Sequence, residues 1–515
     1  MLGAKMPNSV DFSGKPFHFI GIGGVGMSAL AYILAKRQLP VYGSDLKSNS
    51  HTQRLQQLGA HIFWEQNANN LEFFHENVRA DRASTFSSNG NPRRNGRGRP
   101  QNEELPQVIC STAIDSTNAE YRAALDLGCP IFHRSDVLAA LIRDYKSIAV
   151  AGTHGKTTTS SMVGFLLLHA GLDPTIVVGG EVKAWEGNAR LGLGDYLVAE
   201  ADESDGSLVK FDAAIGIVTN IELDHPDHYQ SLDEVTQIFR QFADRCHLTI
   251  GCIDCTVVRD RIAPDLTYSL DPDANADYFA DRIAFSAGGA SARIWERGQA
   301  LGTLELKLLG RHNLSNALAA IAVGRHLGLE FETIANALKQ FEGARRRFEL
   351  RGTIDGIRFI DDYAHHPSEI QATLSAARLQ ADSDPEKIRR VVAVFQPHRY
   401  SRTQTFLTEF AQSFSDADVV VVSDVYSAGE AAFDRAISKR LADALAECHR
   451  CVYYRPQLPE LADFLGDFLE TGDLALFLGA GDLNQIVPQV MEECRQAERD
   501  RPSVQVRSAS SYRIS

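Results

Sequence analysis

Residues 147–159 read Ser-Ile-Ala-Val-Ala-Gly-Thr-His-Gly-Lys-Thr-Thr-Thr, and this stretch decides the fold of the chain around it. The apolar run 147–151 predicts a buried strand, and a helix is expected from Lys156 to Leu168. A tight, glycine-bearing turn between a strand and a helix points backbone N–H groups at an anion. Lys156 adds a positive charge, and Thr157 adds a hydroxyl that can ligate a phosphate-bound metal. The stretch is therefore interpreted as a phosphate-binding loop for ATP.

This loop departs from the general pattern G-x-x-x-x-G-K-[ST] at one position. The pattern requires glycine at position 150, where this chain has Val150. The turn is a shorter variant that spans residues 152–157. A plain strand–turn–helix corner without a ligand is the alternative, but Lys156 followed by three threonines favours the phosphate loop.

The bulk composition restricts the classes of protein that fit. A chain of 515 residues is too long for one hydrophobic core and predicts several domains. Hydrophobic content of 44% and charged content of 23% are ordinary for a soluble globular protein. A net charge of −14 argues against a nucleic-acid or membrane-surface binder. We expect a cytoplasmic protein with no nucleic-acid or membrane partner.

The eight cysteines include two C-x-x-C pairs, 252/255 and 448/451. A zinc site would need these distant pairs to meet in space. Buried, reduced thiols are the favoured interpretation, and they fit a reducing compartment.

The N-terminal segment carries a second glycine pattern. After a leader at 1–15 that is predicted to be disordered, and an apolar strand, Gly21, Gly23 and Gly26 form G-x-G-x-x-G at the start of a helix. The next strand ends at Asp45, which could bond a ribose hydroxyl. This arrangement is the dinucleotide fingerprint, but it suits any nucleotide diphosphate and does not imply NAD. A later segment, 81–106, is rich in Ser, Asn, Gly and Arg and is predicted to be a disordered insertion.

Polar groups follow the strands expected in the middle of the chain. Four carboxylates lie at 200–205, directly after a strand, and are interpreted as Mg²⁺ ligands rather than as a solvated acidic loop. His225 follows the strand 214–219, and its acidic neighbours favour a functional role. Asn313 and Asn316 share one helix face and could bond the edge of adenine.

The C-terminal third repeats one scheme four times. Apolar strands are expected near 359, 391, 419 and 474, each ends in polar residues, and helices separate them. This alternation predicts a doubly wound α/β domain. The predicted fold is thus α/β with a Rossmann-like domain at 16–145, a central P-loop domain with a mostly parallel sheet at 146–342 and a doubly wound domain at 343–499. A disordered tail is expected at 500–515.

Taken together, these motifs resemble the Mur ligase family over about residues 16–490. The matching motifs include Gly-Ile-Gly-Gly-Val-Gly-Met, Gly-Thr-His-Gly-Lys-Thr, Glu-Ala-Asp-Glu-Ser-Asp, Gly-Arg-His-Asn, Asp-Asp-Tyr-x-His-His-Pro and Gln-Pro-His-Arg. The family's short phosphate loop accounts for Val150. The resemblance is strongest to members that join L-alanine to the lactyl carboxylate of UDP-N-acetylmuramate through an acyl phosphate, in peptidoglycan biosynthesis. It implies ATP and Mg²⁺ and a monomer or weak homodimer.

The resemblance also implies roles for individual residues. The UDP-sugar would be bound by Gly21, Gly23, Gly24, Gly26, Met27, Asp45, Ser111 and Thr112. ATP would be bound by Gly152, Thr153, His154, Gly155, Lys156, Thr157, Thr158, His312, Asn313, Asn316, Arg346 and Asp362. The catalytic residues would be Lys156, Glu200 and His225, and the metal ligands Thr157, Glu200 and His225. The amino acid would lie near His365, His366 and Arg399.

One departure from some relatives concerns the second metal. Those relatives hold it with a carbamylated lysine, whereas this chain has no lysine between Lys210 and Lys307. The alanine-adding type tolerates that absence.

Three alternatives remain open. A murein-recycling ligase would add a preformed peptide to the same sugar nucleotide, although the Gly-Gly-x-Gly-Met series at 23–27 favours alanine addition. An NAD-dependent oxidoreductase would explain Asp45 but not the phosphate loop. A nucleotide-binding switch without ligase activity would not need Lys156, Glu200 and His225 together.

Overall fold

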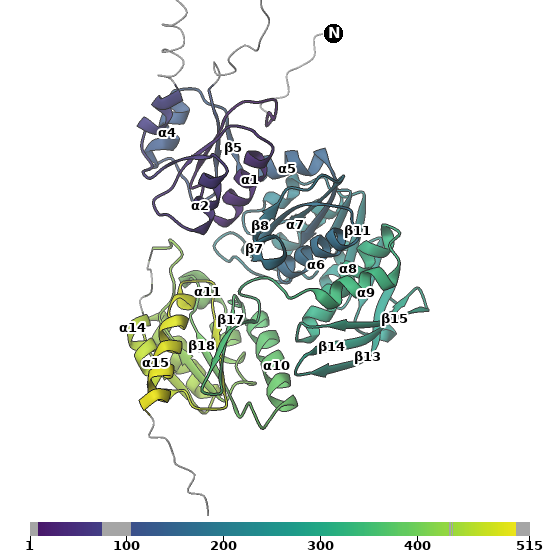
Figure 1. Cartoon of the computed structure of the whole chain (residues 1–515), viewed down its shortest axis with the longest axis vertical. Coiled ribbons are helices and arrows are strands. Elements are labelled where there is room, and N and C mark those ends of the chain that lie inside the picture. Colours follow the sequence, from purple (N-terminus) through teal and green to yellow (C-terminus); the bar gives the residue numbers. More distant parts are fainter. Residues whose placement is uncertain (1–8, 75–104, 432–433, 435, 501–515) are drawn as a thin grey trace, which may run out of the picture. The chain divides into compact units, whose positions relative to one another are not determined.

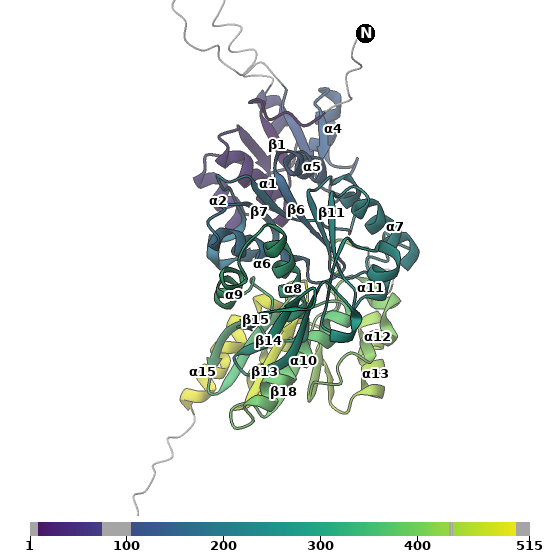
Figure 2. The same cartoon turned by 90° about the vertical axis from the view of Figure 1, so that its right-hand side faces the viewer.

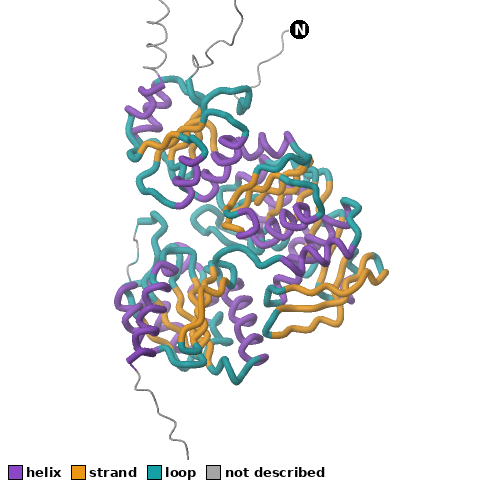
Figure 3. Tube along the Cα trace, viewed as in Figure 1, coloured by secondary structure: helices purple, strands orange, loops and turns teal. Residues whose placement is uncertain are grey.

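The computed structural model describes residues 9–74, 105–431, 434 and 436–500 (Figure 1). The chain forms two compact units: residues 1–284 with 289–345, and residues 285–288 with 346–515. Three sheets and their helices make up these units (Figure 3), which confirms the predicted α/β fold class. The predicted insertion and C-terminal tail lie almost wholly outside the described residues. None of the described helices has the length and apolar character needed to cross a membrane.

The first sheet, in unit 1, has five parallel strands in the order β3-β2-β1-β4-β5. The strands are β1 (Phe17–Ile20), β2 (Val41–Ser44), β3 (His61–Phe63), β4 (Gln107–Cys110) and β5 (Ile131–His133). Its helices are α1 (Val25–Lys36), α2 (Ser50–Gln57), α4 (Ala119–Asp126) and α5 (Arg134–Asp144). All four residues of β1 and of β4 are buried, as expected for parallel strands covered on both faces.

Residues 9–15 are bound to this sheet, which departs from the predicted leader. The backbone N–H of Asp11 donates to Gln107 Oε1 at 2.7 Å, and Gln107 Nε2 donates back to the Asp11 carbonyl at 2.8 Å. The Phe12 ring stacks on Phe17 with centroids 6.0 Å apart.

The second sheet, also in unit 1, has ten strands in the order β15-β14-β13-β12-β11-β10-β6-β9-β7-β8. The strands are β6 (Lys146–Ala151), β7 (Thr175–Val182), β8 (Gly187–Arg190), β9 (Tyr196–Glu200), β10 (Ile215–Val218), β11 (Leu248–Cys252), β12 (Leu266–Ser269), β13 (Tyr278–Ser286), β14 (Gly289–Glu296) and β15 (Gln299–Leu306). The helices are α6 (Lys156–His169), α7 (Leu232–Ala243), α8 (Arg311–His326) and α9 (Phe331–Gln340). β6 lies between β10 and β9, so the phosphate loop leaves the sheet between the loops that follow those strands.

Side chains of β6 alternate between two hydrophobic cores, because successive residues of a strand face opposite sides. Ile148 and Val150 pack into the core that contains α6, α8 and α9 (Figure 2). Ala149 and Ala151 pack into a second core that also contains residues of α1, α5 and α7. The phosphate-loop strand is therefore fixed from both faces, and the second core joins the first two sheets.

The third sheet, in unit 2, has the order β16-β17-β21-β18-β19-β20. The strands are β16 (Glu349–Ile354), β17 (Ile357–Asp362), β18 (Arg390–Phe395), β19 (Val419–Val422), β20 (Val452–Tyr454) and β21 (Asp473–Leu478). The helices are α10 (Pro367–Ser383), α11 (Tyr400–Thr405), α12 (Leu407–Ala411), α13 (Ile437–Cys448), α14 (Leu458–Phe468) and α15 (Val487–Asp500). Only β16 runs antiparallel to its neighbour, so the polar ends of β17, β18, β19 and β21, the four strands predicted in this part of the chain, share one edge.

The prediction that both C-x-x-C pairs are buried holds fully only for Cys252; Cys255 and Cys451 are partly buried, and Cys448 is exposed. Cys448 is the last residue of α13, and its position at the helix end leaves it outside the core.

Candidate active site

The phosphate loop requires glycine at two positions. Gly152 has φ 143°, and a Cβ there would lie 1.9 Å from Thr219 Oγ1. Gly155 has φ 82°, and a Cβ there would lie 2.6 Å from Asn316 Oδ1. A side chain at either position would meet both backbone strain and a collision. The loop therefore keeps its backbone close to the groups packed around it.

The start of α6 has the features of an anion site. Gly155 is its N-cap, no side chain caps the helix, and the first turn holds no acidic residue. The first N–H groups of a helix have no intrahelical partner, and the helix dipole favours negative charge there. The predicted role of this turn therefore has the required local geometry.

Lys156 lies in a network of oxygen atoms at this turn. Its Nζ donates to the Gly152 carbonyl at 2.7 Å and lies 2.7 Å from Glu203 Oε2. Burial lowers the pKa of Lys156, but the charges of Glu203, Asp202 and Glu200 raise it more, so the net shift is upward. Lys156 therefore stays cationic although its side chain is only 13% exposed.

Glu200 connects the acidic loop after β9 to the phosphate loop. Its Oε1 accepts a hydrogen bond from Thr157 Oγ1 at 3.1 Å, and its Oε2 accepts one from the Gly179 N–H at 2.6 Å. A Cβ on Gly179 would lie 2.7 Å from the carboxylate, so glycine permits this approach. Two predicted metal ligands, Thr157 and Glu200, are thereby brought together.

His225 has a strained backbone conformation at the exit of β10. Its φ is 54°, a region that non-glycine residues seldom adopt. Its Nε2 lies 3.6 Å from both Glu203 Oε1 and Asp224 Oδ2. This conformation places the imidazole beside Glu203, the carboxylate that is paired with Lys156.

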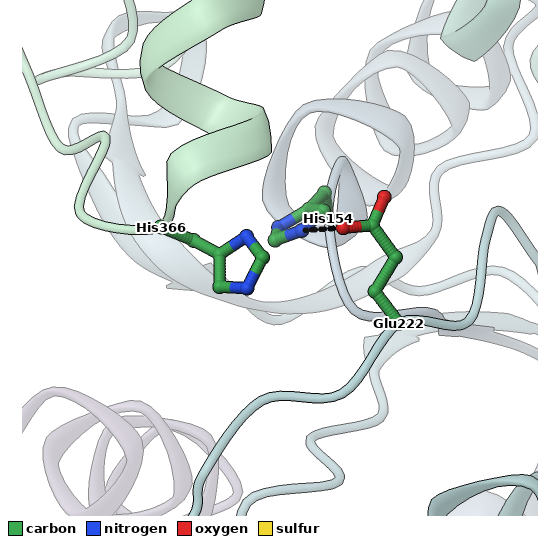
Figure 4. Close-up of side chains that lie close together, drawn as sticks. All are labelled: His154, Glu222 and His366. Atoms are coloured by element: carbon green, nitrogen blue, oxygen red, sulfur yellow. Dashed lines mark ion pairs between the residues drawn. The ribbon is translucent and has the colours of Figure 1, made fainter. Parts of the chain in front are cut away.

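His154 ties the phosphate loop to the segment after β10. Its N–H donates to Asn220 Oδ1 at 2.8 Å, and Thr219 Oγ1 donates to its carbonyl at 2.6 Å. Its Nε2 lies 3.5 Å from Glu222 Oε2 (Figure 4). These contacts of His154 join the phosphate loop to residues 219–222.

The two asparagines of α8 are buried and bonded to each other. Asn313 Nδ2 donates to the Leu309 carbonyl at 2.7 Å, and Asn316 Nδ2 lies 3.4 Å from Asn313 Oδ1. Asn316 also lies against Gly155 of the phosphate loop. The sequence suggested contact with adenine for both, whereas the structure places Asn316 beside the phosphate turn.

The glycine loop after β1 has a network of its own. Asp45 Oδ2 accepts a hydrogen bond from the Gly23 N–H at 2.8 Å, and Asn49 Nδ2 donates to the Gly23 carbonyl at 3.1 Å. Asp45, predicted to meet a ribose, therefore also fixes the loop. Met27 is 3% exposed and belongs to the core.

Three large apolar side chains are exposed where the first sheet's strands end. Val25, Leu46 and Trp64 follow β1, β2 and β3 respectively, and are 44%, 69% and 43% exposed. Ligands of parallel sheets collect at this edge. Sequence reasoning missed Leu46 and Trp64, because an exposed apolar residue has no signature in the sequence.

In unit 2, Asp362 is the buried acceptor of a turn. It accepts hydrogen bonds from the N–H groups of Phe348 at 2.7 Å and Ala364 at 2.8 Å. Burial raises the pKa of Asp362 to about 6, although Arg347 and these N–H groups oppose the shift. Arg346 Nη2 donates to the Gly479 carbonyl at 2.6 Å, so both predicted nucleotide contacts hold the start of this unit.

The three residues predicted to bind the amino-acid substrate lie in different environments. His366 is buried and caps α10, because its ring accepts from the Ser368 N–H. His365 lies at the same strand end, with its ring 5.6 Å from that of His398. Arg399 has φ 69°, and its Nη1 lies 4.0 Å from Glu430 Oε1.

Tyr426 and Glu430 also contact residues at this end of the sheet, and the sequence did not indicate them. The His398 ring stacks on Tyr426 at 5.8 Å, and Glu430 also bonds Ser401. Tyr426 and Glu430 follow β19 and carry no motif that distinguishes them from loop residues.

This fold and these loops define a three-part ATP-dependent ligase, and the comparisons with known families agree. Family models described as "Mur ligase family, catalytic domain", "Mur ligase middle domain" and "Mur ligase, glutamate ligase domain" match residues 16–146, 150–324 and 346–481. The chain belongs to the Mur ligase family.

Individual relatives with the same name are similar to this chain over nearly its whole length. The chain is 63% identical to UDP-N-acetylmuramate–L-alanine ligase of Nostoc punctiforme over 94% of this chain and 98% of that protein. It is 58% identical to the Synechococcus elongatus ligase of the same name, over 95% and 98%. The crystal structure of the UDP-N-acetylmuramate-alanine ligase of Thermotoga maritima is 29% identical, with a TM-score of 0.75 over 94% of this chain and 100% of that one.

Proposed function

We propose that this chain joins L-alanine to the lactyl carboxylate of UDP-N-acetylmuramate, with cleavage of ATP to ADP and phosphate, in peptidoglycan biosynthesis. The observation that carries the proposal is the uncapped start of α6, with Lys156 and the Thr157–Glu200 pair beside it. The 63% identity to a relative with this name supports the choice of substrates.

The chemistry requires two anions to meet. The lactyl carboxylate attacks the γ-phosphate and forms an acyl phosphate; the amine of L-alanine then attacks the acyl carbon, and phosphate leaves. Lys156 and the N–H groups of the turn offset the negative charge that gathers in the transition state. Glu203 holds Lys156 in the cationic form before substrates arrive.

Mg²⁺ fits the oxygen atoms at this turn. Hydroxyl and carboxylate oxygens are its preferred ligands, and Thr157 Oγ1 lies 3.1 Å from Glu200 Oε1. In this proposal Thr157 and Glu200 hold one ion and His225 a second. When bound, such ions would neutralise phosphate charge.

The remaining roles follow from position. Ser111 and Thr112 after β4, with the glycine loop, bind the UDP part, and Leu46 and Trp64 offer an apolar surface to its base. Asn316 lies by the phosphates, while His312 and Asn313 lie nearer the adenine.

In unit 2, Arg346 and Asp362 meet the nucleotide, and His365, His366 and Arg399 lie near L-alanine. The reaction takes place in the cytoplasm, where ATP is available, in a monomer or weak homodimer.

One assay tests this function. Purified protein is incubated with ATP, Mg²⁺, UDP-N-acetylmuramate and single amino acids, and phosphate release is measured. L-Alanine is expected to give release that depends on the sugar nucleotide. Release with a tripeptide but not with L-alanine would favour the recycling ligase, and no release with any acceptor would reject both.

A further inference from the structure

Arg134 lies between the glycine loop and the acidic loop. It is the first residue of α5, directly after β5. Its Nη2 lies 3.1 Å from Asp202 Oδ2 and 3.1 Å from Asp205 Oδ2. Its side chain is 20% exposed, and that of Asp205 only 8%. One nitrogen thus carries both ion pairs, which fixes the plane of the guanidinium group.

The other side of this guanidinium faces the start of α1. A Cβ on Gly26 would lie 3.6 Å from Arg134 Nη1 and 3.7 Å from its Cδ. Within the described residues, Nη1 and Nε have no hydrogen-bond or ion-pair partner. Arginine has five N–H donors, so most of its capacity is directed away from the aspartates.

The start of α1 is itself a place for negative charge. Its N-cap is Gly24, no side chain caps it, and its first turn has no acidic residue. Gly24, Val25 and Gly26 are exposed. A cation beside a helix N-terminus is unfavourable unless an anion lies between them. The aspartates compensate Arg134 on the Nη2 side, whereas its Nη1 faces Gly26 in the first turn of α1.

We propose that Arg134 binds the diphosphate of the sugar nucleotide through Nη1 and Nε and, through Nη2, couples that site to the acidic loop of the ATP site. The proposal rests on the proposed function, because it assumes that a nucleotide diphosphate docks at the glycine loop. A guanidinium fork matches phosphate oxygens in a bidentate manner.

The coupling follows from the short path between the sites. Asp202 and Asp205 flank Glu203, which lies 2.7 Å from Lys156 Nζ, and they follow Glu200, which bonds Thr157. A diphosphate that fixes Arg134 also fixes Asp202 and Asp205, and hence the loop that carries both glutamates. Coupling of this kind is reciprocal, so ATP must change sugar-nucleotide affinity by the same factor as the reverse.

A purely structural role for Arg134 is the competing explanation. A neighbouring ion pair offers a matched control, because Lys210 Nζ donates to Asp136 Oδ1 at 2.7 Å and to Ser135 Oγ at 3.0 Å. That pair also joins α5 to the turn 207–210, which directly follows the acidic loop. Lys210→Met therefore removes a comparable link and leaves Arg134 in place.

The test measures binding by calorimetry with the full-length chain. Arg134→Met is expected to weaken UDP and UDP-N-acetylmuramate at least tenfold, and Lys210→Met less than twofold. Arg134→Lys keeps the charge but loses the fork, so an intermediate loss is expected. Equal affinities for the wild type and a folded Arg134→Met variant would overturn the binding role; if that variant does not fold, Arg134→Lys decides in the same way.

The coupling is tested by repeating the titration with Mg²⁺ and a non-hydrolysable ATP analogue. The wild-type affinity for UDP-N-acetylmuramate is expected to change with the analogue. Asp205→Asn keeps Arg134 but weakens its ion pair with residue 205. In this variant, the ratio of the affinities with and without the analogue should move toward one. A wild-type affinity that is unchanged by the analogue would overturn the coupling.

Failure of the proposed function would have a different outcome. In that case the wild type would not bind UDP-N-acetylmuramate, or would bind it without releasing phosphate in the presence of L-alanine. A wild type that binds and reacts, with an Arg134→Met variant that does both equally well, would overturn only the role of Arg134.

Discussion

Gly155 shows how one residue can fix a binding loop. Its left-handed backbone lets the turn enter α6, and its missing side chain lets Asn316 Oδ1 approach. The sequence identified this glycine by its spacing to Lys156, and the structure adds the reason for it. Val150, which departs from the general phosphate-loop pattern, lies in the core as part of β6.

We predict that Gly155→Ala loses ATP binding, because the Cβ combines backbone strain with a collision at Asn316. Gly171 offers a matched control, since its φ is 75° and nothing lies within 4 Å of an added Cβ. Strain alone should destabilise Gly171→Ala by about 1 kcal/mol without affecting ATP affinity. Calorimetry and urea unfolding check both variants; unchanged ATP affinity in Gly155→Ala would contradict the argument.

Lys156→Met is predicted to lower the rate of phosphate release on the order of 10²–10³-fold, because transition-state charge loses its nearest cation. Lys183 is a suitable control, since its side chain is 84% exposed. Lys183→Met should keep the wild-type rate. Steady-state phosphate release measures both, and a fully active Lys156→Met would exclude the proposed mechanism.

The raised pKa of Asp362 predicts that the free energy of unfolding depends on pH. Its folded pKa of about 6 lies above the ordinary value of 3.8, so the folded state favours the protonated form. Its stabilising contribution is full below pH 4 and is lost as the pH rises through 6. Relative to wild type, Asp362→Asn should therefore gain stability between pH 4 and pH 7, by roughly 2–3 kcal/mol. Urea unfolding at several pH values checks this, and a pH-independent difference would show that the shift is absent.

At the scale of elements, α10 combines a structural and a candidate functional role in one residue. His366 caps the helix through the Ser368 N–H, and Glu369 closes the capping box. A buried histidine that caps a helix needs no ligand to explain it. The two roles require different substitutions to separate them.

His366→Asn retains a good cap, whereas His366→Ala removes it at a cost of about 1 kcal/mol. We predict that only the alanine variant loses stability, while both raise the KM for L-alanine. Thermal unfolding and the KM for L-alanine provide the two measurements. An asparagine variant with the wild-type KM would reduce His366 to a capping residue.

The ends of β6, β9 and β10 illustrate how neighbouring strands gather a site. β6 pairs with β10 on one side and β9 on the other, so residues 152, 200 and 219 leave the sheet side by side. The sequence shows that each strand ends in polar residues. Only the strand order shows that these ends are adjacent.

At the scale of the whole molecule, unit 1 contains the glycine loop, the phosphate loop and the acidic loop. Its second core includes α1 and α5 from the first sheet and α7 from the second. Ligands that bind this unit only when it is folded should therefore stabilise it.

We predict that ATP raises the melting temperature of the full-length chain only when Mg²⁺ is present, because in the proposed site the ion would link phosphate oxygens to Thr157 and Glu200, whose side chains are hydrogen-bonded to each other. ATP at about 100 times its Kd should stabilise the folded state by about 2.7 kcal/mol. EDTA should abolish the shift, and added Mg²⁺ should restore it. An equal shift with EDTA would argue against a metal at this site.

Local patterns allowed most of the fold to be predicted from the sequence. The strand at 147–151, the helix from Lys156 and the four C-terminal strands follow from apolar runs and from glycines at turns, which are short-range signals. The sequence did not indicate a role for four residues near the candidate sites: Arg134, Tyr426, Glu430 and Trp64. The neighbours that suggest a role for each of them are distant in the sequence. The predicted disorder of residues 9–15 is wrong for the same reason, because the contact that orders Asp11 is with Gln107, a residue distant in the sequence.

The sequence by itself determined the class of chemistry: a shortened phosphate loop, a glycine loop for a diphosphate, and carboxylates at strand ends. The tertiary structure decided which of these groups meet, because strand order and helix packing set distances that spacing along the chain leaves open. It placed Glu203 on Lys156, Asn316 on Gly155, and Arg134 between the glycine loop and the acidic loop. Charges and hydrogen bonds act over a few ångströms, so these meetings, more than the motifs themselves, determine what each residue does.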